Sequence, residues 1–126
     1  PSLNWIIHDN TITDCLRPAV FDSYGSKTSL FRNNLVSRGK TPGVLLAIEV
    51  RGSFRFGNNH IIGFDEENAA ALKLFPDAID RTPACQFQDN IFENCFSVIA
   101  ESRTGLWKNC HTNNNMTIEC LNKIPK

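Results

Sequence analysis

An asparagine recurs along this chain in a fixed local context, and this recurrence constrains the fold more than any other feature. Asn10, Asn34, Asn59 and Asn90 follow one another at spacings of 24, 25 and 31 residues. An apolar side chain stands three residues before each of them and another stands two residues after it, while the residue directly before it is Asp or Asn. Self-similarity at a period of roughly 20–50 residues predicts a solenoid, in which each repeat packs on the next.

A fifth repeat is assigned to "LWKNCHTNN" at 106–114, with Cys110 in the asparagine position. The apolar positions three residues before the column are then Ile7, Phe31, Phe56, Phe87 and Trp107, and those two residues after it are Ile12, Val36, Ile61, Phe92 and Thr112. We therefore expect five equivalent units.

Within a repeat the apolar side chains alternate as they do in strands. "WII" at 5–7 and "SFRF" at 53–56 place apolar residues two apart, and a polar pair then turns the chain. A second apolar segment follows in each unit, at 19–21, 44–50, 70–74, 96–100 and 116–118. Helical solenoids need amphipathic stretches of about 10 residues or more, which are absent here. We predict an all-β fold: a right-handed single-stranded parallel β-helix of about five coils, in one domain over residues 1–126.

The asparagines suit an inward-facing corner of such a coil. Their side-chain amides can bond both to the backbone of the turn and to the asparagine of the next coil. Asn and Asp also tolerate the left-handed backbone that a tight corner requires. We therefore predict an inward asparagine ladder with a structural rather than a catalytic role.

Four segments carry a resemblance to a known group of proteins. They are "IHDNTITDC" (7–15), "FRNNLVSRG" (31–39), "FGNNHIIGF" (56–64) and "FQDNIFENC" (87–95). With them nearly the whole chain resembles the right-handed parallel β-helix (pectin-lyase-like) superfamily. The stretch "IEVRGSFRFGNNHIIGFDEENAAALKLFPD" (48–77) also resembles bacterial polysaccharide-degrading β-helix proteins. The resemblance implies a fold rather than one activity, because members include polysaccharide lyases, glycoside hydrolases, epimerases and phage tailspikes. It implies a polysaccharide or oligosaccharide partner and a secreted or periplasmic location.

Two classes of function remain open. One is a carbohydrate-active enzyme, either a polysaccharide lyase or a glycoside hydrolase, or part of one. The other is a non-catalytic β-helix module: an adhesin, a tail module or a carbohydrate-binding stack. Thirteen basic and thirteen acidic residues give a net charge of zero, so we expect neither nucleic acid nor membrane as a partner. Mixed charges and aromatic residues on one face favour the enzyme.

Candidate site residues come from aligning the second strands of the repeats. One outward column then holds Asp22, Glu49, Lys73, Glu101 and Glu119, and the next holds Tyr24, Arg51, Phe75 and Arg103. Neighbouring coils would place Asp22 and Glu49 about 5 Å apart, close to the carboxylate separation of retaining glycosidases. Lys73 and Arg51 would neutralise a uronate, or Lys73 would serve as the base of a lyase.

We accordingly predict catalytic roles for Asp22, Glu49 and Lys73. The predicted substrate-binding residues are Tyr24, Arg51, Phe75, Glu101 and Arg103. The alternative is an ordinary solvated ladder of salt bridges, in which each pair contributes roughly 0.2–1 kcal/mol.

We expect no cofactor, with calcium as the one candidate, since the carboxylates of "DEEN" at 65–68 could chelate it or form an exposed corner. The five cysteines have no CxxC spacing, so we expect buried free thiols rather than a zinc site or a disulfide framework. Uncapped coils expose strand edges. We therefore expect the chain to be an excerpt of a longer β-helix, stacked on the missing coils of its parent chain, or to self-associate end to end.

Overall fold

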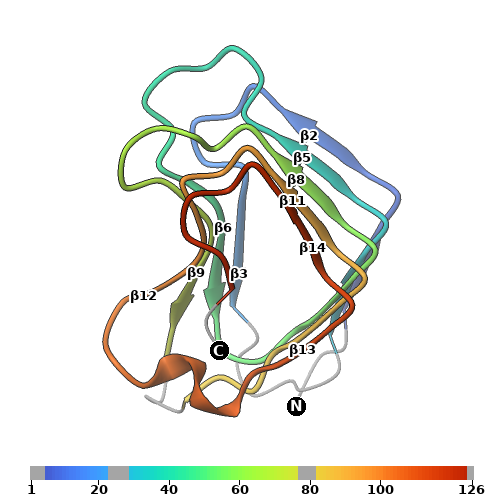
Figure 1. Cartoon of the computed structure of the whole chain (residues 1–126). Coiled ribbons are helices and arrows are strands. Elements are labelled where there is room, and N and C mark those ends of the chain that lie inside the picture. Colours follow the sequence, from blue (N-terminus) through green and yellow to red (C-terminus); the bar gives the residue numbers. More distant parts are fainter. Residues whose placement is uncertain (1–4, 23–28, 77–81, 125–126) are drawn as a thin grey trace.

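The computed structural model describes residues 5–22, 29–76 and 82–124, whose strands form three parallel sheets (Figure 1). The first sheet contains β1 (Ile6–His8), β4 (Leu30–Arg32), β7 (Arg55–Gly57), β10 (Gln86–Gln88) and β13 (His111–Asn113). The second contains β2 (Thr11–Thr13), β5 (Leu35–Ser37), β8 (His60–Ile62), β11 (Ile91–Glu93) and β14 (Met116–Ile118). The third contains β3 (Ala19–Asp22), β6 (Leu46–Arg51), β9 (Ala70–Phe75) and β12 (Ser97–Glu101). A short 3-10 helix, η1 (Leu106–Asn109), precedes β13.

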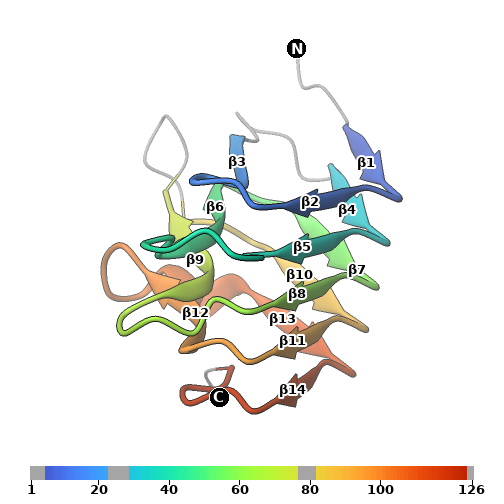
Figure 2. The same ribbon diagram turned by 90° about the horizontal axis from the view of Figure 1, so that it is seen from above.

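Each of the first four coils contributes one strand to each sheet, so the chain winds around three sides of a tube. Figure 2 shows the result as rungs, with β2, β5, β8, β11 and β14 lying one above another. The fifth coil supplies β13 and β14 but no strand of the third sheet among the described residues, which leaves about four full turns. The predicted all-β parallel β-helix is confirmed, and the predicted number of coils is roughly matched.

The interior is built on a stack of aromatic rings from the first sheet. Phe56 lies 5.8 Å from Phe31 and 5.2 Å from Phe87, measured between ring centroids, and Trp107 continues the stack 5.6 Å beyond Phe87. The three phenylalanines are almost fully buried. Burying one such side chain contributes about 1.5–3 kcal/mol. The aromatic column is therefore a main source of cohesion between successive coils.

The corner between the first and second sheets has a left-handed residue in every coil. The φ angles are 58° at Asp9, 56° at Asn33, 54° at Asn58, 58° at Asp89 and 55° at Asn114. A residue with a larger or β-branched side chain would be strained there, whereas Asp and Asn tolerate this conformation. This explains why Asp or Asn precedes each ladder asparagine.

The asparagine ladder runs through the coils as predicted. The backbone N–H of Asn34 donates to Oδ1 of Asn59, that of Asn59 to Oδ1 of Asn90, and that of Asn90 to Oδ1 of Asn115, each over 3.0 Å. The Nδ2 of Asn59 also donates to the carbonyl of Phe31 at 2.9 Å and to Oδ1 of Asn90 at 3.0 Å. Asn34, Asn59 and Asn90 are at most 2% exposed, and these bonds give their buried polar atoms the partners that water cannot supply.

The fifth repeat was aligned wrongly. Asn115, not Cys110, occupies the fifth ladder position, and Thr112 rather than Trp107 pairs with Phe87. Trp107 belongs to η1 and reaches the aromatic stack from outside the strand. As a consequence, residues 116–118 form β14 of the second sheet instead of a strand of the third.

Candidate functional site

The register of the third sheet decides which predicted site residues are neighbours. Glu49 pairs with Lys73 and Arg51 pairs with Phe75, as the sequence alignment predicted. Asp22, however, pairs with Arg51, and Val20 stands beside Glu49. The alignment of Asp22 with Glu49 was therefore wrong by two residues, and the two acidic residues do not form the expected pair across adjacent strands.

The remaining predicted residues also leave the expected columns. Ala100 takes the place beside Lys73, while Glu101 pairs with Leu74 and its Oε1 accepts the backbone N–H of Trp107 at 2.6 Å. Glu119 lies in the turn after β14, with a φ of 53°. Arg103 lies in the exposed bend after β12. Tyr24 falls outside the described residues.

Glu49 is the centre of a compact charged cluster on this face. Its Oε1 is 3.2 Å from Nη2 of Arg17 and its Oε2 is 3.0 Å from Nε of Arg51, and the residue is only 7% exposed. The Arg51 guanidinium lies 4.4 Å from the centroid of the Phe75 ring, and Nζ of Lys73 lies 5.5 Å from it. A buried carboxylate needs such partners. Glu49 therefore orients Arg51 over the Phe75 ring, with both of its oxygens already engaged.

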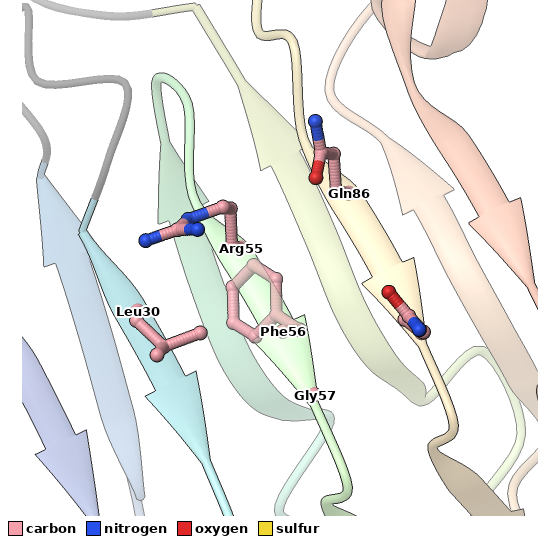
Figure 3. Close-up of a pocket in the computed structure, with 6 residues that line it drawn as sticks. Leu30, Arg55, Phe56, Gly57 and Gln86 are labelled. Atoms are coloured by element: carbon pink, nitrogen blue, oxygen red, sulfur yellow. The ribbon is translucent and has the colours of Figure 1, made fainter.

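A second candidate surface lies on the outer face of the first sheet, where sequence reasoning placed nothing. A hollow of about 110 Å³ is lined by Leu30, Arg55, Phe56, Gly57, Gln86 and Gln88 (Figure 3). A second hollow of about 90 Å³ is lined by Gln86, Phe87, Gln88, His111, Thr112 and Asn113. Because the two hollows share Gln86 and Gln88, they adjoin each other across β7, β10 and β13. We call these two adjoining hollows together the glutamine groove.

Strand alternation explains the lining of the glutamine groove. Since Phe56 and Phe87 point inward, the residues on either side of each point outward. One outward column contains Leu30, Arg55, Gln86 and His111, and the other contains Arg32, Gly57, Gln88 and Asn113. Figure 3 shows Leu30, Arg55 and Gln86 on three neighbouring strands, with Gly57 further along the strand that holds Arg55.

The depth of the first of these hollows depends on Gly57. A Cβ atom built at this position would meet nothing closer than the carbonyl oxygen of Gln88, at 3.8 Å. The missing side chain therefore leaves an opening that the backbone does not fill. The sequence does contain a signal for this surface, in "RFG" at 55–57 and "QFQ" at 86–88. In each triplet a buried phenylalanine is flanked by two outward positions, which hold Arg and Gly in the first and two Gln in the second. This signal predicts a hollow only once the strand register is known, because the register places Gly57 beside Gln88.

The acidic segment at 65–68 does not gather its carboxylates. Asp65 pairs with Arg38 at 3.2 Å, and Oε1 of Glu66 accepts the backbone N–H of Gly43 at 2.9 Å. Across residues 5–22, 29–76 and 82–124, no three His, Cys, Asp or Glu side chains come together as metal ligands. Calcium binding stays a prediction. No helix in the same ranges has the length and apolar character to cross a membrane.

Comparison of the chain with protein-family models, curated proteins and solved structures finds no match. The evidence for the parallel β-helix fold is therefore the structure alone. The relationship to the pectin-lyase-like superfamily stays a prediction from the four repeat segments.

Proposed function

We propose that the protein binds a polysaccharide or oligosaccharide lying across the coils in the glutamine groove. The observation that carries this proposal is the pair of adjoining hollows over β7, β10 and β13. Their lining combines amide, guanidinium and imidazole groups with the apolar side chain of Leu30. Sugars present both hydroxyl groups and apolar ring faces, and binding sites for them need fixed polar partners next to an apolar surface.

The polar groups of the groove support this location over the face around Glu49. Gln86, Gln88, His111 and Asn113 are exposed. The amides offer both donors and acceptors, which hydroxyl groups can meet in either role. On the other face, both oxygens of Glu49 are held by arginines and the Arg51 guanidinium lies on Phe75. A ligand there would have to displace contacts that already satisfy one another.

Binding without catalysis is the function that the groove supports best. Hydrolysis of a glycosidic bond uses a pair of carboxyl groups, and elimination requires a positioned base. The groove has no carboxylate in its lining, and His111 contributes its one imidazole. We therefore favour a non-catalytic β-helix module over a lyase or hydrolase. A polysaccharide ligand also agrees with the proposed pectin-lyase-like relationship and with a secreted or periplasmic location.

The substitution Gly57→Leu tests the proposal, because it fills the groove at a position where the backbone leaves room. Calorimetry with a panel of neutral and uronate-containing oligosaccharides would identify a ligand and give its affinity. We expect Gly57→Leu to weaken binding by at least about tenfold, the equivalent of roughly 1.4 kcal/mol.

Lys73→Ala on the third sheet is the matched control, and we expect it to retain the affinity of the unaltered protein. The opposite pattern, with Lys73→Ala impaired and Gly57→Leu unaffected, would move the site to the face around Glu49. Release of new reducing or unsaturated ends by the unaltered protein would contradict a purely binding role.

A further inference from the structure

Two cysteines stand side by side where the fourth and fifth coils meet. The backbone N–H of His111 donates to the carbonyl of Cys85 at 2.9 Å, and Gln86 pairs with His111 in the register of β10 and β13. Cys110, which directly precedes His111, is therefore the neighbour of Cys85. Neighbouring parallel strands lie about 4.8 Å apart, which is inside the Cα separation of about 4.4–6.8 Å that a disulfide spans.

Cys95 and Cys120 form a second pair with the same arrangement. The backbone N–H of Leu121 donates to the carbonyl of Cys95 at 3.3 Å, which sets Cys120 beside Cys95. Both thiols of this pair are buried, and all five cysteines of the chain are free. The protein thus contains two similar thiol pairs between the same two coils, and each can serve as the control for the other.

The two pairs differ in reactivity. A hydrogen bond from Cys85 lowers the pKa of Cys110 from the ordinary value of 9.0, while the same contact raises the pKa of Cys85 well above it. Burial raises the pKa of Cys95 to about 12. Cys110 is also partly exposed, whereas Cys85, Cys95 and Cys120 are buried. Since the thiolate is the reactive form, Cys110 is the thiol of these four that is best prepared to react.

We propose that Cys85 and Cys110 are a redox-active dithiol that closes into a disulfide by exchange with a low-molecular-weight disulfide such as oxidised glutathione. The Cys110 thiolate attacks one sulfur of the oxidant, whose S–S bond breaks and releases one glutathione thiolate. Cys85 then gives its proton to solvent, and its sulfur attacks the sulfur of Cys110 and displaces the second glutathione thiolate. The protein loses two hydrogen atoms, and one oxidised glutathione becomes two reduced molecules.

The disulfide would fix the last coil against the rest of the helix. It closes a loop over residues 85–110, which contains η1 and therefore Trp107. Trp107 stacks on Phe87 at 5.6 Å, so the bond would hold the end of the aromatic column in place. Closing a loop in this way restricts the unfolded chain and stabilises the folded one. The inference does not depend on the proposed saccharide binding.

The test is a redox titration of the full chain in glutathione buffers, with thiols blocked by alkylation and linked peptides mapped by mass spectrometry. We expect the peptide pair joined through Cys85 and Cys110 to appear at least about tenfold faster than a pair joined through Cys95 and Cys120. A Cys95→Ser variant should keep this linkage, and a Cys110→Ser variant should lose it. Equal rates for the two pairs, or no Cys85–Cys110 linkage in any buffer, would overturn the proposal.

A second measurement separates reactivity from folding. Below pH 9, iodoacetamide should alkylate Cys110 several-fold faster in the unaltered protein than in a Cys85→Ala variant with the same circular dichroism spectrum, because alanine removes the hydrogen-bond donor that lowers the pKa of Cys110. Equal alkylation rates in the two proteins would show that the cysteines do not act as a pair.

Discussion

At the scale of single residues, the ladder explains why asparagine and no similar residue fills the corner. The Oδ1 of Asn59 accepts from the preceding coil, while its Nδ2 donates to the Phe31 carbonyl and to Asn90. An ionised aspartate would offer acceptors only, so it could not make the two donor contacts. A glutamine is one methylene longer and would not fit the same buried corner without strain. The recurrence of asparagine is therefore a requirement of hydrogen bonding and length together.

A first prediction follows for the middle of the ladder. Asn59→Leu should lower the free energy of unfolding by roughly 1–3 kcal/mol, because the Phe31 carbonyl and the backbone N–H of Asn34 would be left buried without their partners. Urea unfolding followed by circular dichroism measures the change. Asn10→Leu, at the exposed end of the ladder, is the control and should cost much less. Equal losses in the two variants would contradict the ladder as a source of stability.

A second prediction concerns the left-handed corner residue Asn58, which is exposed and has a φ of 54°. Asn58→Val should destabilise the protein by about 1–2 kcal/mol, because a β-branched residue is strained in this conformation. Asn58→Gly should be close to neutral, since glycine adopts a positive φ without strain. Thermal unfolding of both variants checks the prediction. Gln88→Val is the control, because it introduces valine at an exposed strand position. If Gln88→Val destabilises the protein as much as Asn58→Val does, the positive φ of Asn58 is not the cause of the loss.

At the scale of elements, the positions on both sides of the asparagine corner could be aligned correctly in the first four coils because the ladder ties them together. Phe56, Asn59 and Ile61 stand at fixed distances around one corner, so the register of β7 also sets that of β8. The third sheet has no such tie. The chain between the second and third strands runs over residues 14–18, 38–45, 63–69 and 94–96 in successive coils. These unequal lengths are why the alignment of Asp22 failed by two residues.

The fifth coil was misaligned for a different physical reason. The spacing from Trp107 to Cys110 imitates the spacing from an aromatic ring to a ladder asparagine. The structure continues the aromatic stack from η1, and the strand position beside Phe87 holds the smaller Thr112. Asn115 lies 25 residues after Asn90, which matches the spacing of the earlier repeats better than Cys110 does. The spacing between asparagines therefore predicts the position of the fifth coil better than the aromatic residue three positions earlier does.

The candidate surfaces were predictable only in part. The neighbours Glu49 and Lys73, and Arg51 and Phe75, could be aligned because β6 and β9 are both six-residue strands with similar patterns. The glutamine groove could not be found in this way. The groove depends on the lack of a side chain at Gly57. A glycine leaves a hollow only where side chains of neighbouring coils stand around it, and the sequence alone does not show which residues those are.

At the scale of the whole molecule, the coils make a tube whose two ends differ from its middle. Within the described residues, β1, β2 and β3 are the edge strands at one end, and β13, β14 and β12 are those at the other. Trp5 is 56% exposed in the column that is buried further along at Phe54 and Cys85. At the opposite end, Leu121 is 69% exposed. Both ends therefore combine unpaired strand edges with apolar side chains.

The last prediction is that residues 1–126 self-associate end to end as their concentration rises. An unpaired parallel edge is a template for another chain, and the exposed apolar residues would be buried in the contact. The ladder could continue across it, with the backbone N–H of Asn115 donating to Oδ1 of Asn10 in a second copy, as Asn90 donates to Asn115. Sedimentation velocity at several concentrations should show species larger than the monomer. Trp5→Lys should reduce them, because it places a charge at the edge, whereas Gln88→Lys on a side face should not. A single monomeric species at every concentration would contradict the prediction and indicate that the ends are already protected.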